Sequence, residues 1–199
     1  MRTIIAITQL SLDGVMQSPG APEEDPSHGF KQGGWFMRFP DKHLQRTIHQ
    51  LIGGRFALLL GRRTYDIFAG FWPRHDDNPI GKAFNRADKY VVTHQPKSLA
   101  WDRSQAIGGN VVAKLRRLKK TQGPVLHVWG SSELLQTLIA GDLIDEHRLW
   151  IAPVVLGKGK RLFEEGVPPR HLTLVKSLRT PSGLLLNTYR PGKKLKPPA

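Results

Sequence analysis

Short, mostly apolar runs alternate with spaced apolar stripes along the first two thirds of the chain. The runs contain no glycine or proline and lie at residues 3–9, 56–60, 89–93 and 125–129. Runs of this length are typical of buried strands, because both faces of a parallel sheet are covered. We therefore predict four buried strands in this part of the chain.

Stripes with helical spacing separate these runs and predict helices at residues 41–52, 65–68, 110–120 and 132–139. Asn110 is expected to cap the third helix, and Ser131 or Ser132 the fourth. The alternation of strands and helices indicates an α/β fold, in which a largely parallel sheet is covered on both faces.

The last third of the chain has a different pattern. Residues 146–155, 171–178 and 184–189 are expected to form strands without helices between them. Such strands add an antiparallel end to the sheet. We expect one domain over residues 1–190, followed by a basic, proline-rich tail over residues 191–199.

A long segment without a helical or strand pattern follows the first strand. Residues 11–35 contain eight glycines and prolines, together with Glu23, Glu24 and Asp25. Structureless segments of this length are uncommon in compact domains and often serve as lids. We expect a mobile lid that contributes nothing to the core.

Composition narrows the functional classes. The 199 residues include 30 Lys and Arg against 16 Asp and Glu, a net charge of +14, and no cysteine. Without cysteine there is no disulfide, thiolate metal site or cysteine nucleophile, and we expect no metal. The apolar runs are far shorter than the roughly 20 residues of a membrane span, and the chain does not begin with a signal-peptide core, so we expect a cytoplasmic protein.

The basic surplus is compatible with nucleic acid or with phosphorylated small molecules as partners. Much of it lies at residues 114–120 and 190–196, where no aromatic residues alternate with the charges. Because stacking on bases would require such aromatics, a solvated surface is favoured over a nucleic-acid groove. A small molecule is the expected partner.

Two predicted junctions between a strand and a helix carry residues suited to phosphate. Residues 61–64 read Gly-Arg-Arg-Thr, and residues 130–132 read Gly-Ser-Ser. Helix N-termini at the carboxyl ends of parallel strands offer N–H groups and a partial positive charge to anions. The alternative is that Gly61 only ends a strand and that the serines only cap a helix. Two phosphate sites together favour a dinucleotide.

The order of short motifs along the chain resembles the dihydrofolate reductase superfamily. The motifs are Leu12-Asp13-Gly14, residues 61–65, residues 90–94, residues 128–131, and Pro153-Val154-Val155-Leu156-Gly157-Lys158-Gly159. The first and last are more similar to the branch that includes the reductase domain of bacterial riboflavin biosynthesis. The resemblance extends from about residue 2 to residue 190. It implies a dihydrofolate reductase-like fold with a mostly parallel central sheet, helices on both faces and an antiparallel C-terminal hairpin.

The resemblance also implies a cofactor and its binding residues. NADPH would lie across the carboxyl ends of the strands, with Arg62 and His94 favouring it over NADH through its 2′-phosphate. Substrate would contact Trp35, Leu156 and Gly157. The residues implied for the cofactor are Gly61, Arg62, Arg63, Thr64, Thr93, His94, Trp129, Gly130, Ser131 and Ser132.

Two acidic residues are candidates for the proton donor that a reductase needs. Asp41 follows Trp35 and Pro40 in an order that resembles the acidic position of folate reductases, and Asp13 lies in the Leu-Asp-Gly turn. The alternative roles are structural. An aspartate is common at the start of a helix, and Asp-Gly is common in turns.

The leading hypothesis is an NADPH-dependent reductase of a pyrimidine-like or pterin-like compound, resembling the 5-amino-6-(5-phosphoribosylamino)uracil reductase of riboflavin biosynthesis. A true dihydrofolate reductase is less favoured, because Gly130-Ser131 stands where those enzymes carry two glycines. A basic binding protein without catalysis is the third hypothesis. A homodimer formed through the C-terminal strands is also expected, since an open sheet leaves an edge to be covered.

Overall fold

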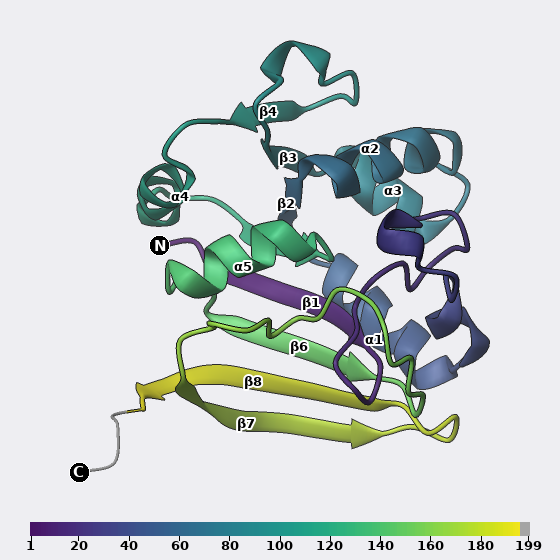
Figure 1. Cartoon of the computed structure of the whole chain (residues 1–199). Coiled ribbons are helices and arrows are strands. Elements are labelled where there is room, and N and C mark those ends of the chain that lie inside the picture. Colours follow the sequence, from purple (N-terminus) through teal and green to yellow (C-terminus); the bar gives the residue numbers. More distant parts are fainter. Residues whose placement is uncertain (196–199) are drawn as a thin grey trace.

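The computed structural model describes residues 1–195 and contains one mixed sheet of eight strands in the order β4-β3-β2-β5-β1-β6-β8-β7 (Figure 1). The first six strands in this order run parallel, and β8 pairs antiparallel with β6 on one side and with β7 on the other. This confirms a parallel sheet with an antiparallel C-terminal hairpin. The strands are β1 Ile4–Leu10, β2 Phe56–Gly61, β3 Asp88–Val92, β4 Ser104–Ile107, β5 Val125–Trp129, β6 Glu146–Ile151, β7 Arg170–Arg179 and β8 Leu185–Lys194.

Five α-helices cover the sheet, and their placement on both faces confirms the arrangement that the sequence predicted. They are α1 Lys42–Ile52, α2 Arg62–Phe71, α3 Pro79–Arg86, α4 Val111–Lys120 and α5 Ser132–Ala140. Helices α4 and α5 cross the face that is turned to the viewer in Figure 1, and α1 lies behind β1. Short 3-10 turns lie at Ser27–Gly29, Trp35–Arg38, Trp72–Arg74 and Pro96–Ser98.

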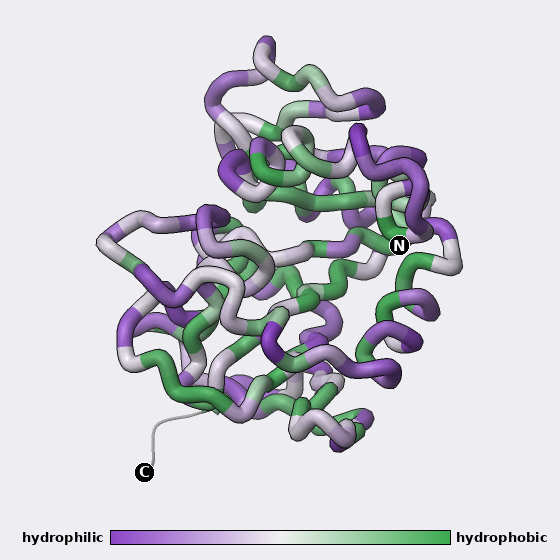
Figure 2. Tube along the Cα trace, turned by 90° about the vertical axis from the view of Figure 1, so that its right-hand side faces the viewer, coloured by the Kyte–Doolittle hydropathy of each residue, from purple (hydrophilic) through white to green (hydrophobic). Residues whose placement is uncertain are grey.

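The alternation of side chains along β1 divides the core between the two faces. Ile4 and Ala6 belong to the cluster under α4 and α5, whereas Ile5 and Ile7 pack on the opposite face with Leu44 of α1. A third cluster joins β2 and β3 to α2 and α3. Figure 2 shows the hydrophobic positions concentrated along the central strands and the hydrophilic positions toward the outside.

Helix α3 and strand β4 were not predicted from the sequence. Both are short, and their apolar residues are too few to produce a clear periodicity. The start of α3 is nevertheless well defined, because the Asn78 side chain accepts a hydrogen bond of 2.9 Å from the Gly81 N–H. Strand β4 lies at the outer edge of the sheet and pairs only with β3.

The expectation that residues 11–35 contribute nothing to the core is wrong. Val15, Met16, Phe30 and Trp35 of this segment are all buried. The indole N–H of Trp35 donates a hydrogen bond of 2.8 Å to the Gln17 carbonyl. Apolar residues spaced widely among glycines and prolines form no pattern that local periodicity detects, yet they pack once the segment folds back. The segment keeps the name lid below.

The C-terminal strand extends further than the sequence indicated. Strand β8 continues to Lys194, so the expected boundary at residue 190 falls inside it. Residues 196–199 of the expected tail lie outside the described part of the chain. Strand β7 forms the edge of the sheet and exposes Leu174 and Val175. The homodimer stays a prediction.

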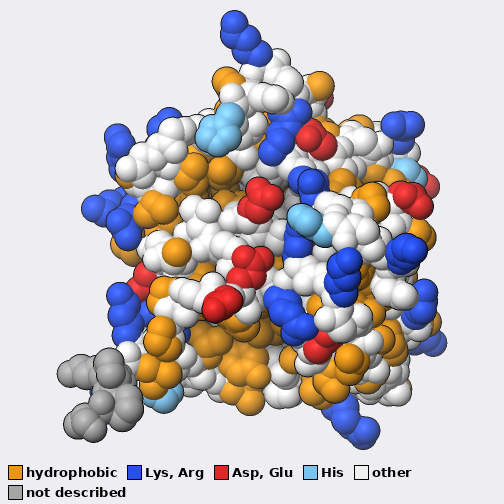
Figure 3. Space-filling model, in the orientation of Figure 1, with side chains coloured by type: hydrophobic (Ala, Val, Ile, Leu, Met, Phe, Trp, Pro, Cys, Tyr) orange, Lys and Arg blue, Asp and Glu red, His pale blue; other side chains and the backbone are white. Residues whose placement is uncertain are grey.

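Basic side chains do not gather into one stripe on the face shown in Figure 3, where Lys and Arg are scattered with Asp and Glu between them. Base-stacking grooves instead combine a continuous positive track with aromatic side chains. Among the helices of residues 1–195, none has the length and apolar character needed to cross a membrane.

Candidate functional site

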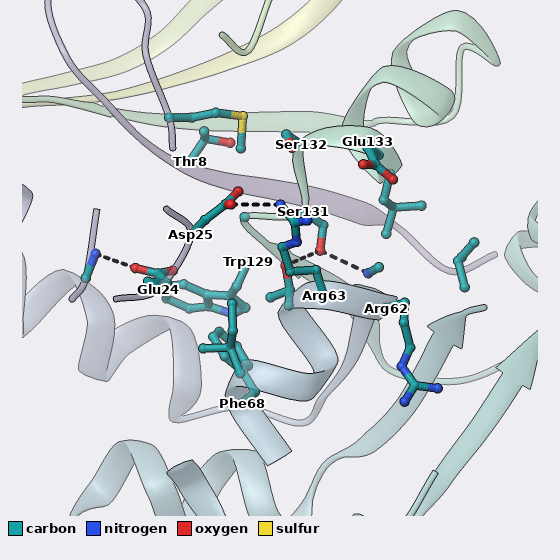
Figure 4. Close-up of a pocket in the computed structure, with 18 of the residues that line it drawn as sticks. Thr8, Glu24, Asp25, Arg62, Arg63, Phe68, Trp129, Ser131, Ser132 and Glu133 are labelled. Atoms are coloured by element: carbon teal, nitrogen blue, oxygen red, sulfur yellow. Dashed lines mark hydrogen bonds and ion pairs between the residues drawn. The ribbon is translucent and has the colours of Figure 1, made fainter. Parts of the chain in front are cut away.

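A cavity of about 760 Å³ lies where β1, β2, β3 and β5 end and α2 and α5 begin. Its walls include all ten residues that the sequence assigned to a cofactor. Residues of the lid close another side (Figure 4). The ten are Gly61, Arg62, Arg63, Thr64, Thr93, His94, Trp129, Gly130, Ser131 and Ser132.

The hydroxyl of Ser131 joins the two junctions between strand and helix. It accepts a hydrogen bond of 2.9 Å from the Gly61 N–H and donates one of 2.8 Å to the Thr64 hydroxyl. A Cβ at position 61 would lie only 3.3 Å from the Ser131 side chain, so this approach favours glycine. Gly130 and Ser131 both have positive φ, 64° and 69°, which turns the chain sharply into α5.

The expectation that Ser131 or Ser132 caps α5 through its side chain is wrong. Ser131 occupies the capping position but makes no side-chain bond to the first turn, because its hydroxyl is directed to Gly61 and Thr64 instead. Helix α2, which Gly61 precedes, also lacks a side-chain cap. Two helix N-termini without side-chain caps therefore border one cavity, where their N–H groups and partial positive charge suit an anion.

The two arginines of the first junction point in different directions in Figure 4. Arg62 extends toward the end of β3. Its Nε donates to both carboxylate oxygens of Asp66 at 2.9 Å, and its Nη1 donates to the Ser98 hydroxyl at 2.5 Å and to the Gln95 carbonyl at 3.4 Å. Thr93 and His94, which follow β3, also line the cavity.

Arg63 extends toward the lid, where Asp25 joins two cations. The Asp25 carboxylate accepts hydrogen bonds of 2.7 Å from Arg63 and 2.8 Å from Lys160. Burial alone would raise the pKa of Asp25, but hydrogen bonds from Lys160, Ser27 and Arg63 outweigh it and hold the pKa well below its usual range. Asp25 therefore stays ionised and ties the lid to α2.

Aromatic side chains form an apolar wall of the cavity. Phe84 lies at the centre of this group, with ring centroids 5.6 Å from Phe68, 5.2 Å from Trp72 and 5.6 Å from Trp129. The indole N–H of Trp129 and the hydroxyl of Thr8 are buried without a hydrogen-bond partner among the described residues. This wall can accommodate a flat ring, and the two polar atoms can orient it.

Sequence reasoning missed several residues that line the cavity, among them Thr8, Gln17, Glu24, Asp25 and Lys160. Glu24 and Asp25 were taken only as evidence against a core. An acidic pair inside a long glycine-rich and proline-rich segment was the available signal, since polar loop residues beside a rigid sheet often carry function.

Asp41 does not line the cavity. Its carboxylate caps α1, accepting hydrogen bonds from the His43 and Leu44 N–H groups, and it also accepts from the N–H and hydroxyl of Ser182. Burial alone would raise the pKa of Asp41, but these bonds outweigh it and hold the pKa well below its usual range. The carboxylate joins α1 to the turn between β7 and β8, outside the cavity.

Asp13, Leu156 and Gly157 lie together, but outside the lining of the cavity. The Asp13 carboxylate accepts hydrogen bonds of 3.1 Å from the Leu156 N–H and 2.9 Å from the Gly157 N–H. These bonds fix the Leu-Asp-Gly turn to the loop after β6. Trp35, the other residue implied for substrate, is only 1% exposed and packs in the core. None of these four residues lines the cavity.

Comparisons with known proteins agree with this architecture. A family model for the RibD C-terminal domain matches residues 2–186. The uncharacterized protein YyaP of Bacillus subtilis is 26% identical over 196 residues, which cover 94% of each chain.

Two solved structures share the fold. A diaminohydroxyphosphoribosylaminopyrimidine deaminase/5-amino-6-(5-phosphoribosylamino)uracil reductase from Thermotoga maritima is 14% identical with a TM-score of 0.63, covering 96% of this chain and 57% of that one. Dihydrofolate reductase from Enterococcus faecalis, complexed with NADP(H) and RAB-propyl, is 16% identical with a TM-score of 0.56, covering 96% and 97%. The expected dihydrofolate reductase-like fold is thus confirmed.

Proposed function

The chain belongs to the family of RibD C-terminal domains, and on that premise we propose that it is an NADPH-dependent reductase of a small heteroaromatic compound. The observation that carries the proposal is the meeting of two helix N-termini without side-chain caps, both arginines and an aromatic wall around one cavity. The structures of an NADP(H)-complexed dihydrofolate reductase and of a uracil reductase with the same fold support it.

The residues of this chain divide the proposed tasks between them. The turns at residues 61–64 and 130–132 would hold phosphates through backbone N–H groups and hydroxyls. The aromatic wall around Trp129 would hold flat rings and exclude water. When bound, the nicotinamide would supply a hydride. The substrate would be a pyrimidine-like or pterin-like compound.

Arg62 and His94, which both line the cavity, would select NADPH over NADH. The guanidinium of Arg62 lies at the end of β3, held by Asp66 and Ser98, and can pair with a 2′-phosphate. We expect Arg62→Ala to weaken NADPH binding by about 1–3 kcal/mol, as the loss of a charge-assisted hydrogen bond does, and NADH binding much less. Tryptophan fluorescence during cofactor titration measures both affinities, since Trp129 and Trp72 line the cavity.

Arg46→Ala is the matched control, because Arg46 is an exposed arginine of α1 and does not line the cavity. It is expected to leave both affinities unchanged. Equal losses for NADPH and NADH in Arg62→Ala would contradict the role of Arg62. An unmodified chain that shows no response to NADPH would contradict the reductase proposal itself and favour a binding protein without catalysis. Turnover is tested by NADPH absorbance with a panel of aminopyrimidines and pterins.

A further inference from the structure

We propose that Glu24 of the lid is the proton donor of the reaction proposed above. This inference rests on the proposed reductase function. It assigns a catalytic role that the two acidic candidates from the sequence, Asp13 and Asp41, do not fill, because neither lines the cavity.

The geometry of the lid presents one oxygen of Glu24 to a ligand. Its Oε2 accepts hydrogen bonds of 2.7 Å from the Gly20 N–H and 3.2 Å from the Ala21 N–H. Within residues 1–195, Oε1 accepts no hydrogen bond. Both the residue and the turn at Gly20 line the cavity (Figure 4). The carboxyl is therefore held by one oxygen while the other remains available to substrate.

The other acidic residues that line the cavity are less suited to hold a proton. Asp25 accepts hydrogen bonds from Arg63 and Lys160, which keep it ionised. Glu133 lies in the first turn of α5, where the helix dipole favours a negative charge. Among the three carboxyl groups of this lining, Glu24 is the one that has no ion pair within residues 1–195 and does not lie in the first turn of a helix.

The electrostatic surroundings of Glu24 favour its protonated form. Burial raises the pKa of Glu24, the neighbouring charge of Asp25 raises it further, and the two backbone N–H bonds offset only part of this effect. Two cations, Arg63 and Lys160, also line the cavity, and both are paired with the Asp25 carboxylate rather than with Glu24. A general acid works best when its pKa is near the operating pH, and these surroundings move Glu24 in that direction.

The proposed step is balanced for a substrate with a C=N or C=O group. The carbon accepts a hydride from the reduced nicotinamide, and the electron pair of the π bond moves to the nitrogen or oxygen. That atom takes the proton from Oε1 of Glu24, so the O–H bond breaks and a new N–H or O–H bond forms. Glu24 is left as a carboxylate, which water reprotonates after product leaves.

The first measurement requires no substrate. The chain is labelled with ¹³C at the glutamate carboxyls, and the signal missing from Glu24→Gln is assigned to Glu24. We expect this signal to titrate above the usual glutamate value of about 4.3 and to shift when NADPH is added. A Glu24 signal that titrates at the usual value and does not shift when NADPH is added would overturn the proposal, even if the variant turns over more slowly.

The second measurement is turnover with each panel compound that the unmodified chain reduces. Glu24→Gln keeps an oxygen that can accept from Gly20 and Ala21, yet it has no carboxyl proton to give. We expect kcat to fall about 10²-fold or more, with the affinity for NADPH unchanged. We also expect kcat of the unmodified chain to fall at high pH, where Glu24 loses its proton, and we expect this fall to be absent in the variant.

Glu23→Gln is the matched control, because Glu23 is the exposed neighbour and does not line the cavity. It should leave kcat and its pH profile unchanged. Normal turnover and an unchanged pH profile in Glu24→Gln would overturn the role of Glu24 while leaving the reductase proposal intact. Failure of NADPH to bind the unmodified chain would instead overturn the reductase proposal and Glu24 with it.

Discussion

At the scale of single residues, Ser131 shows how a strained conformation is stabilised at the cavity. A serine with φ of 69° costs free energy that a glycine would avoid. The cost is offset because the Ser131 hydroxyl bonds both the Gly61 N–H and the Thr64 hydroxyl. Glycine at this position would relieve the strain but break the link between α2 and α5.

Two substitutions separate these contributions. Ser131→Ala keeps the strain and leaves the Gly61 N–H without its partner, so we expect it to lower the free energy of unfolding by about 1–3 kcal/mol. Ser131→Gly loses the same bonds but relieves the backbone, so it should be about 1 kcal/mol more stable than Ser131→Ala. Denaturant unfolding measures both. Ser132→Ala is the control, and equal stability of the two Ser131 variants would contradict a strained backbone.

At the scale of elements, the sequence predicted the parts of the fold in which local pattern and packing agree. The four buried strands, the basic helix capped by Asn110 and the C-terminal hairpin were predicted and are present. Strand β4 and helix α3 were missed because both are short and local periodicity is weak there. The lid packs through contacts that are distant in sequence, such as the isolated bridge between Val15 and Arg161, which no local pattern reveals.

The lid also carries a prediction about dynamics. Asp25 of the lid forms ion pairs with Arg63 of α2 and with Lys160 of the loop after β6, and all three residues line the cavity that we assign to NADPH. Bound cofactor would add contacts to this segment, whereas the central strands are already buried. We therefore expect NADPH to slow amide hydrogen exchange over residues 16–25 more than in β1 or β5. Equal slowing in the lid and the strands, or none in the lid, would contradict a closing role.

At the scale of the whole molecule, the sequence predicted which residues meet at the cavity better than it predicted the surroundings of the acidic candidates. Residues 61–64 and 130–132 come together because carboxyl ends of parallel strands share one edge of a sheet, a rule that topology alone supplies. The environments of Asp13 and Asp41 could not be predicted in this way. Their partners, Gly157 and Ser182, lie more than 140 positions away in the chain.

Two buried histidines make the stability of the whole molecule depend on pH. Burial, with Arg148 near His127 and Arg170 near His147, lowers the pKa of each to about 4. In the unfolded chain these histidines are protonated near pH 6.5, whereas in the folded chain they are protonated only near pH 4. Between these values the unfolded state therefore binds more protons than the folded state. The stabilising contribution is therefore complete above pH 6.5 and is lost as the pH falls toward 4.

We expect each histidine to lower the free energy of unfolding by about 2 kcal/mol between pH 7.5 and pH 5, which denaturant unfolding at both values measures. His127→Gln removes one titrating group, so the free energy of unfolding should differ between the two pH values by about 2 kcal/mol less than in the unmodified chain. This holds even if the variant is less stable at pH 7.5. His49→Gln, at an exposed position of α1, should leave the difference unchanged. Asp25 and Asp41 have lowered pKa values, so their contributions to stability are lost only below pH 5. They therefore do not add to the change in the free energy of unfolding between pH 7.5 and pH 5. If His127→Gln left the pH dependence of the free energy of unfolding unchanged, His127 would have the same pKa in the folded and unfolded chain, which would contradict the prediction.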